Sequence, residues 1–181
     1  PPYNLSNHQV IQFQADLDNH LIDNHFSDRL FSSSQKILSF GLDIQASSKK
    51  RAIEEAARLL GARPSLPESE QIFERLLERE RLGSTGIGDG IAIPHGKVQD
   101  LDELVLSFRR STQGIEFDSM DGRPTHLFFL LIAPENSAGI HLRALAKISR
   151  LLKSAHFRQR LLEAGTIEEI FHVIQEEDKE F

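Results

Sequence analysis

An unbroken apolar run of strand length, Leu127 to Ala133, constrains the fold of this chain more than any other segment. A strand with one face in water alternates apolar and polar residues, whereas a strand covered on both faces is apolar throughout. The segment from His126 to Ala133 therefore predicts a central strand of a sheet with helices on both sides. A membrane-spanning helix would need roughly 20 apolar residues, and no run in the chain approaches that length.

The segments around this strand alternate between helical and strand periodicity. Leu104 to Arg109 alternates in the manner of a strand with one well-buried face, and Gly90 to Pro94 predicts a short strand. Helices are predicted to begin after Ser47, at the capping-box spacing Ser65–Glu68, near Leu142, at Phe157 and at a second capping box, Thr166–Glu169. This mixture predicts the α/β class, with a mixed, mostly parallel β-sheet flanked by helices.

Composition places the chain among ordinary globular proteins. It has 181 residues, 39% of them hydrophobic and 27% charged, which suits one domain with a sizeable core. Residues 1–30 are rich in Asn, Asp, His and Gln and are interpreted as an N-terminal extension of uncertain origin to a domain at 31–181. Two interpretations of this extension stay open, a segment docked on the domain and a partly disordered tail. The absence of cysteine excludes disulfides and thiolate chemistry, and the net charge of −6 argues against nucleic-acid binding. No secretory leader is recognised, so we expect a cytoplasmic protein.

A glycine-rich stretch that leads to a histidine is the main candidate for chemistry. Gly83 to Gly90 combines four glycines with Ser84 and Thr85, and a short apolar run then ends at His95, followed by Gly96. Glycine lets other backbone approach closely, so the His95 ring is expected to stay open to a partner as a nucleophile. The glycines expected to line its binding site are Gly86, Gly88, Gly90 and Gly96.

Other interpretations of this stretch fit less well. A nucleotide P-loop would need a different glycine spacing and Ser or Thr after Lys97, where Val98 stands. A dinucleotide fingerprint would need a preceding strand and a later third glycine. A metal site at two histidines would take Asp89 or Glu135 as a third ligand, but no H-x-x-x-H spacing occurs. No G-x-S-x-G elbow suggests a serine hydrolase.

Among the other histidines, His141 stands out because it opens a predicted helix. Helix N-termini offer free N–H groups and a positive dipole, which favour a phosphoryl group. His8, His20 and His25 lie in the extension. His156 and His172 are expected to be solvated on helices, and His126 to be a satisfied residue at a strand start.

The segment from Arg79 to Lys97, with the helix start Ser47–Arg51, resembles the EIIA domains of the phosphoenolpyruvate-dependent phosphotransferase system, in the fructose/mannitol class. The nitrogen-regulatory branch matches best, and the resemblance runs from about Leu38 to Ile174. It implies a mixed sheet flanked by helices. It also implies a phosphotransferase in which His95 accepts a phosphoryl group on Nε2 from an HPr-type carrier. His141 and Arg79 would then help to place that group, and no metal or other cofactor is implied.

The resemblance also suggests an output. Sugar-transporting relatives pass the phosphoryl group to a cysteine of a IIB domain, and this chain has no cysteine. A stand-alone regulator, whose phosphorylation state controls targets such as potassium-transport components, is therefore expected. Two alternatives stay open: a non-catalytic regulatory binding module, and a IIA component that serves a separate sugar-specific IIB/IIC transporter.

Overall fold

A computed structural model of the chain describes residues 36–62 and 65–180. The extension predicted at residues 1–30, with His8, His20 and His25, lies outside the described residues. None of the described helices is long and apolar enough to cross a membrane.

The sheet runs in the order β1-β5-β6-β3-β2, and a further strand, β4, pairs with β6. The strands are β1 (Lys36–Asp43), β2 (Gly86–Gly88), β3 (Ile91–Ala92), β4 (His95–Val98), β5 (Leu104–Ile115) and β6 (Thr125–Pro134). The pairs β1·β5, β3·β6 and β4·β6 are parallel, while β5·β6 and β2·β3 are antiparallel. The predicted mixed sheet is confirmed, with its longest ladder antiparallel.

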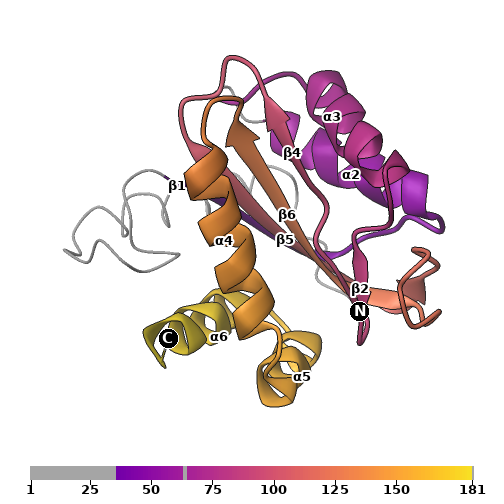
Figure 1. Cartoon of the computed structure of the whole chain (residues 1–181). Helices are drawn as coiled ribbons and strands as arrows, with labels where there is room; N and C mark the ends of the chain where they lie inside the picture. Colours follow the sequence, from indigo (N-terminus) through magenta and orange to yellow (C-terminus); the bar gives the residue numbers. More distant parts are fainter. Residues whose placement is uncertain (1–35, 63–64, 181) are drawn as a thin grey trace.

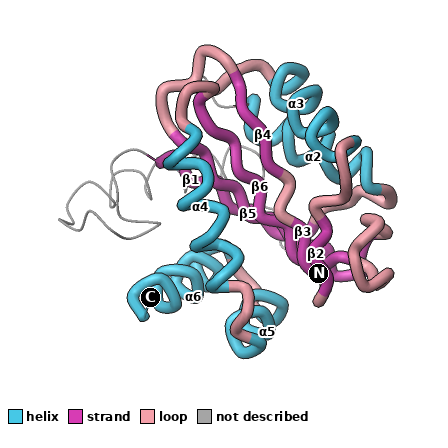
Figure 2. The backbone as a smooth tube through the Cα atoms, viewed as in Figure 1, coloured by secondary structure: helices cyan, strands magenta, loops and turns pink. Residues whose placement is uncertain are grey.

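Helices cover both faces of this sheet (Figures 1 and 2). One layer holds α2 (Lys49–Gly61) and α3 (Ser69–Arg81), and the other holds α4 (Ala138–Leu151), α5 (Ala155–Glu163) and α6 (Ile167–Glu180). Successive residues of β6 enter opposite cores: Phe128 and Leu130 pack with α2 and α3, while Leu127 and Phe129 pack with the α4–α6 layer. The continuous apolar run therefore marks a central strand buried on both faces, as predicted.

The helix starts agree with the sequence at one predicted capping box and disagree at the other. Thr166 Oγ1 accepts a hydrogen bond from the Glu169 amide at 3.1 Å, as a capping residue should. The box predicted at Ser65–Glu68 is wrong, because α3 begins only at Ser69. A start at Ser65 would require Leu66, which precedes Pro67, to adopt the helical conformation that a following proline disfavours.

The strand predicted at Gly90–Pro94 is broken in two. β3 ends at Ala92 and β4 begins at His95. The Pro94 carbonyl still accepts a hydrogen bond from the Leu131 amide of β6 at 2.9 Å, so Ile93 is the residue whose backbone leaves the ladder. His95 therefore opens a strand, whereas the sequence suggested that it would close one. Pairing with β6 keeps one register across the break, with Ile91 opposite Leu127 and His95 opposite Leu131. The backbone of Ile93 is thus freed for other partners without an inserted residue.

Candidate functional site

His95 lies where the sheet meets the first turn of α4. Its register partner Leu131 packs in the core of the α4–α6 layer, and residues opposite each other in a ladder share a face. The His95 side chain therefore points toward α4, while Gly96 points toward α3 on the other face. The ring is half-buried, so it is held by its surroundings and can still be reached from solvent.

Two contacts specify the protonation state of the His95 ring. Nδ1 lies 2.7 Å from the carbonyl oxygen of Ile93, which can only accept a hydrogen bond. Arg79 Nε donates to the other ring nitrogen, Nε2, at 2.9 Å. Both contacts require the same neutral tautomer, with the proton on Nδ1 and a lone pair on Nε2. The break at Ile93 supplies the carbonyl that selects this tautomer.

The environment also keeps His95 neutral. Burial lowers the pKa of His95 below its usual 6.5, and the neighbouring Arg79 guanidinium lowers it further. The hydrogen bond to the Ile93 carbonyl and the charge of Glu80 act in the opposite direction without reversing the shift. Because only the neutral ring has a free lone pair, this shift favours a nucleophile at neutral pH.

His141 lies beside His95 in the first turn of α4. The two ring centroids are 5.5 Å apart, with the planes tilted by 51°. The side chain is buried, and its Nε2 has no hydrogen-bond partner among the described residues. Burial, with the nearby His95 and Lys97, lowers the pKa of His141 to about 4. A buried ring nitrogen without a partner is costly, so His141 Nε2 is available to hydrogen-bond a group that enters this site.

The N-terminus of α4 is open at the same place. The hydroxyl of Ser137, the residue before the helix, donates to the Pro134 carbonyl at 2.6 Å and makes no cap hydrogen bond. The first-turn N–H groups of a helix have no partners within the helix, so they can bind an anion.

The sequence reasoning placed His95, His141 and Arg79 in one site, and the structure brings these three side chains together.

Packing and backbone conformation explain why glycine occupies positions 86, 88 and 90. A Cβ at Gly86 would lie 2.6 Å from Ser119 Oγ, and Gly88 and Gly90 have φ angles of +93° and +75°. The nearest neighbours of these three glycines are residues 119–126 and do not include His95. Gly96 differs, since a Cβ there would lie 3.4 Å from the backbone of Arg75 on α3. A direct binding role for Gly86, Gly88 and Gly90 stays a prediction.

The remaining histidines have ordinary surroundings. His126 Nδ1 contacts the Ser111 carbonyl at 2.9 Å, and His156 and His172 are exposed. In residues 36–62 and 65–180, no group of three or more His, Cys, Asp or Glu side chains could hold a metal ion.

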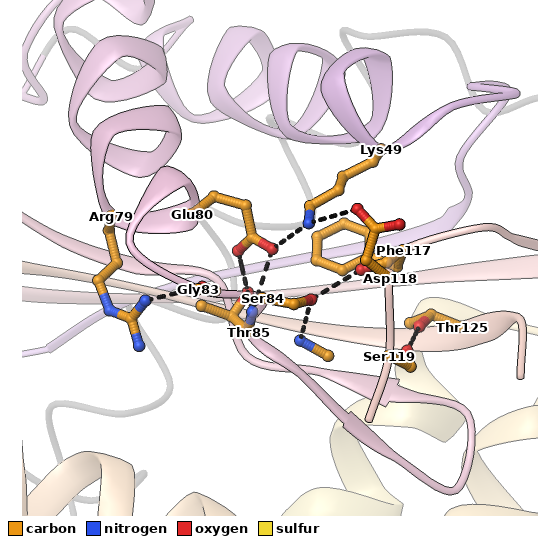
Figure 3. A network of polar contacts seen from close by, with 11 residues as sticks. Lys49, Arg79, Glu80, Gly83, Ser84, Thr85, Phe117, Asp118, Ser119 and Thr125 are labelled. Atoms are coloured by element: carbon orange, nitrogen blue, oxygen red, sulfur yellow. Dashed lines mark hydrogen bonds and ion pairs between the residues drawn. The ribbon is translucent and has the colours of Figure 1, made fainter. Parts of the chain in front are cut away.

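Sequence reasoning missed one buried residue of this region, Glu80. Its side chain is only 3% exposed and forms a salt bridge of 2.7 Å with Lys49 of α2 (Figure 3). Glu80 follows the buried Ile72 and Leu76 at intervals of four, so it continues the apolar stripe of α3. That spacing was the available signal for its burial.

The chain was compared with known protein families and structures. Residues 34–177 match the family model described as "Phosphoenolpyruvate-dependent sugar phosphotransferase system, EIIA 2". The chain is 41% identical to a nitrogen regulatory protein of Bradyrhizobium diazoefficiens over 72% of this chain and 85% of that protein. It is also 38% identical to the fructose-specific EIIABC component of Bacillus subtilis over 76% of this chain. The matched region makes up only 22% of that longer protein.

A solved structure agrees with the sequence matches. The crystal structure of the nitrogen regulatory protein IIA-Ntr from Neisseria meningitidis is 38% identical and superposes with a TM-score of 0.72 over 76% of this chain and 96% of that one. The chain therefore belongs to the EIIA type 2 family of the phosphoenolpyruvate-dependent phosphotransferase system, a family of phosphotransfer components.

Proposed function

We propose that this protein accepts a phosphoryl group on Nε2 of His95 from the phosphohistidine of an HPr-type carrier protein. The observation that carries the proposal is the paired contact of the His95 ring. Ile93 holds the proton on Nδ1 at 2.7 Å, and Arg79 meets the lone pair of Nε2 at 2.9 Å. The nucleophilic nitrogen therefore faces a cation that can bind the incoming phosphoryl oxygens.

The transfer exchanges one nitrogen–phosphorus bond for another. The Nε2 lone pair of His95 attacks phosphorus in line with the bond to the carrier histidine, which leaves with its own lone pair. His95 gains positive charge as the new bond forms, and the Ile93 carbonyl stabilises this charge through the Nδ1 proton. No water, metal or electron transfer is needed, so catalysis rests on positioning and electrostatics.

Three groups can stabilise the transferred phosphoryl group. The Arg79 N–H that donates to Nε2 in the free protein turns to a phosphoryl oxygen once Nε2 is bonded to phosphorus. His141, whose pKa is lowered to about 4, is neutral at pH 7 and donates a hydrogen bond from Nε2 without adding charge. The open first turn of α4 supplies backbone N–H groups to the same oxygens. The absence of a side chain at Gly96 keeps α3, and with it Arg79, close to β4.

The test is the intact mass of the protein after incubation with phosphoenolpyruvate, enzyme I and an HPr-type carrier. We expect the mass of one acid-labile phosphoryl group on the wild-type protein and none on His95→Asn. The matched control is His156→Gln, which alters an exposed histidine and should be labelled normally. Equal labelling of His95→Asn and wild type would refute the assignment.

The output of the site is proposed to be regulatory. Several relatives at 37–41% identity are named nitrogen regulatory proteins, which supports a regulatory output. In this proposal the phosphorylation state of His95 controls cytoplasmic partners, such as the potassium-transport components that the family resemblance suggests. A second candidate is favoured by the fructose-specific relatives, namely donation to a separate sugar-specific IIB domain. Loss of the label on addition of a purified IIB domain would favour the second. Partner capture that differs between phosphorylated and unphosphorylated protein would favour the first.

A further inference from the structure

Glu80 is a buried carboxylate that the proposed transfer step does not use. It follows Arg79 directly in the last turn of α3, but its side chain points the other way, into the protein (Figure 3). It accepts hydrogen bonds from the Thr85 amide at 3.0 and 3.1 Å and from the Thr85 hydroxyl at 2.5 Å. The Lys49 ammonium, at 2.7 Å, adds a third donor. A carboxylate held in this way fixes the groups around it.

A chain of hydrogen bonds leads from Glu80 to the His95 ring. Glu80 holds the amide of Thr85, and the carbonyl of Thr85 accepts a hydrogen bond from the Ile93 amide at 3.0 Å. The carbonyl of Ile93 then accepts from His95 Nδ1 at 2.7 Å. The residue whose carbonyl selects the reactive tautomer, Ile93, is therefore tied to Thr85, which Glu80 holds in place.

A second chain leads from the same helix end to Arg79. The Nη1 of Arg79 donates to the Gly83 carbonyl at 3.0 Å, while its Nε donates to His95. Gly83 belongs to the loop that Glu80 anchors two residues later, at Thr85. The loop from Gly83 to Thr85 thus orients both His95 and Arg79, which meet at His95 Nε2. Lys49, through Glu80, links this loop to the start of α2.

We propose that Glu80, held by Lys49, is a positioning residue that sets the tautomer of His95 and the direction of Arg79, a role that presupposes the phosphoryl transfer proposed above. The geometry explains why a carboxylate occupies the buried face of an otherwise solvated run of charged residues, Glu78 to Arg81. An apolar side chain would fill the space, but it would leave the Thr85 amide without an acceptor and the Lys49 ammonium with Asp118 as its remaining partner.

The decisive experiment is ¹⁵N–¹H NMR of the imidazole rings in wild type and Glu80→Ala, together with the single-turnover rate of phosphoryl transfer. We expect wild-type His95 to show one tautomer, with the proton on Nδ1. Glu80→Ala should show a mixture of tautomers and transfer about ten- to a hundredfold more slowly, the cost of misplacing reacting groups. The control is Glu74→Gln, an exposed residue of the same helix, which should match wild type in both measurements.

If Glu80→Ala does not fold, Lys49→Gln decides the question, because it removes the cation that holds the Glu80 carboxylate and so loosens the contacts of that carboxylate with Thr85. It should shift the tautomer and slow transfer in the same direction. A single Nδ1-protonated tautomer and a wild-type rate in the folded variant would overturn the positioning role. If wild type itself accepts no phosphoryl group, the proposed function fails, and the tautomer measurement still tests the positioning of the ring by Glu80.

Discussion

His141 should make the stability of this protein depend on pH in a way that can be isolated. The folded protein lowers the pKa of His141 from 6.5 to about 4, chiefly through burial and then through the nearby His95 and Lys97. The unfolded chain therefore takes up a proton at a higher pH than the folded protein. The stabilisation by the neutral ring is fully present above pH 6.5 and is lost as the pH falls toward 4.

The magnitude follows from the size of the shift. One pKa unit corresponds to about 1.4 kcal/mol, so the full shift corresponds to about 3 kcal/mol below pH 4. Between pH 7.5 and 5.5, proton uptake by the unfolded chain should remove about 1 kcal/mol of the free energy of unfolding through His141 alone. The lowered pKa of His95 adds a loss of the same sign in both wild type and a His141 variant.

The assay is urea unfolding of wild type and His141→Gln at both pH values. We expect the free energy of unfolding to fall less in His141→Gln than in wild type, by about 1 kcal/mol. His156→Gln, at an exposed histidine, should show the wild-type loss. If His141→Gln loses as much stability as wild type between the two pH values, His141 does not carry the shift and its neutrality at the site must be abandoned.

Three further predictions follow from contacts described by the structure. Arg79→Lys keeps a positive charge but loses the guanidinium N–H that donates to His95 Nε2. Phosphoryl transfer, measured by rapid quench, should therefore slow by at least about tenfold. An unchanged rate would show that the positive charge alone is sufficient. Arg110 is buried, donates to carbonyls at the end of α5 and pairs with Asp43 at 3.1 Å, so Arg110→Met should lower the free energy of unfolding by about 2–4 kcal/mol in urea. Gly86→Ala places a methyl group 2.6 Å from the Ser119 hydroxyl. The free energy of unfolding, measured by thermal unfolding, should therefore fall by about 1–3 kcal/mol. An unchanged stability would mean that the loop around Ser119 moves away at no cost.

Periodicity predicted most of the secondary structure because the elements it identified are amphipathic or wholly buried. The continuous apolar run of β6 and the apolar faces of helices α2 to α6 could each be recognised within a short segment of sequence. Strand β1 was not predicted, because its evidence lies in a parallel partner far along the chain, with Phe40 opposite Phe108. Pairing across such a separation leaves little trace in a short segment of sequence.

The sequence indicated the three side chains that the structure brings together at the candidate site, but not the residues that support them. His95 and His141 stood out by their local context, and Arg79 came from the family resemblance. Glu80 was passed over because a glutamate between two arginines reads as a solvated residue, and charged residues are seldom buried. Only the interval of four from Leu76 indicated its position, and its partners Lys49 and Thr85 come from other elements.

The position of α3 has a consequence for how a partner protein can approach. Strand β4 pairs with β6 along one side, and the backbone of α3 at Arg75 packs against Gly96 on its other face. The same strand turns His95 toward α4, on the face opposite to the one that α3 covers. A protein that reaches the His95 ring must therefore approach from the side of α4, because α3 and the sheet close the other side. In the transfer proposed above, the carrier would accordingly present its histidine next to the first turn of α4, which carries His141.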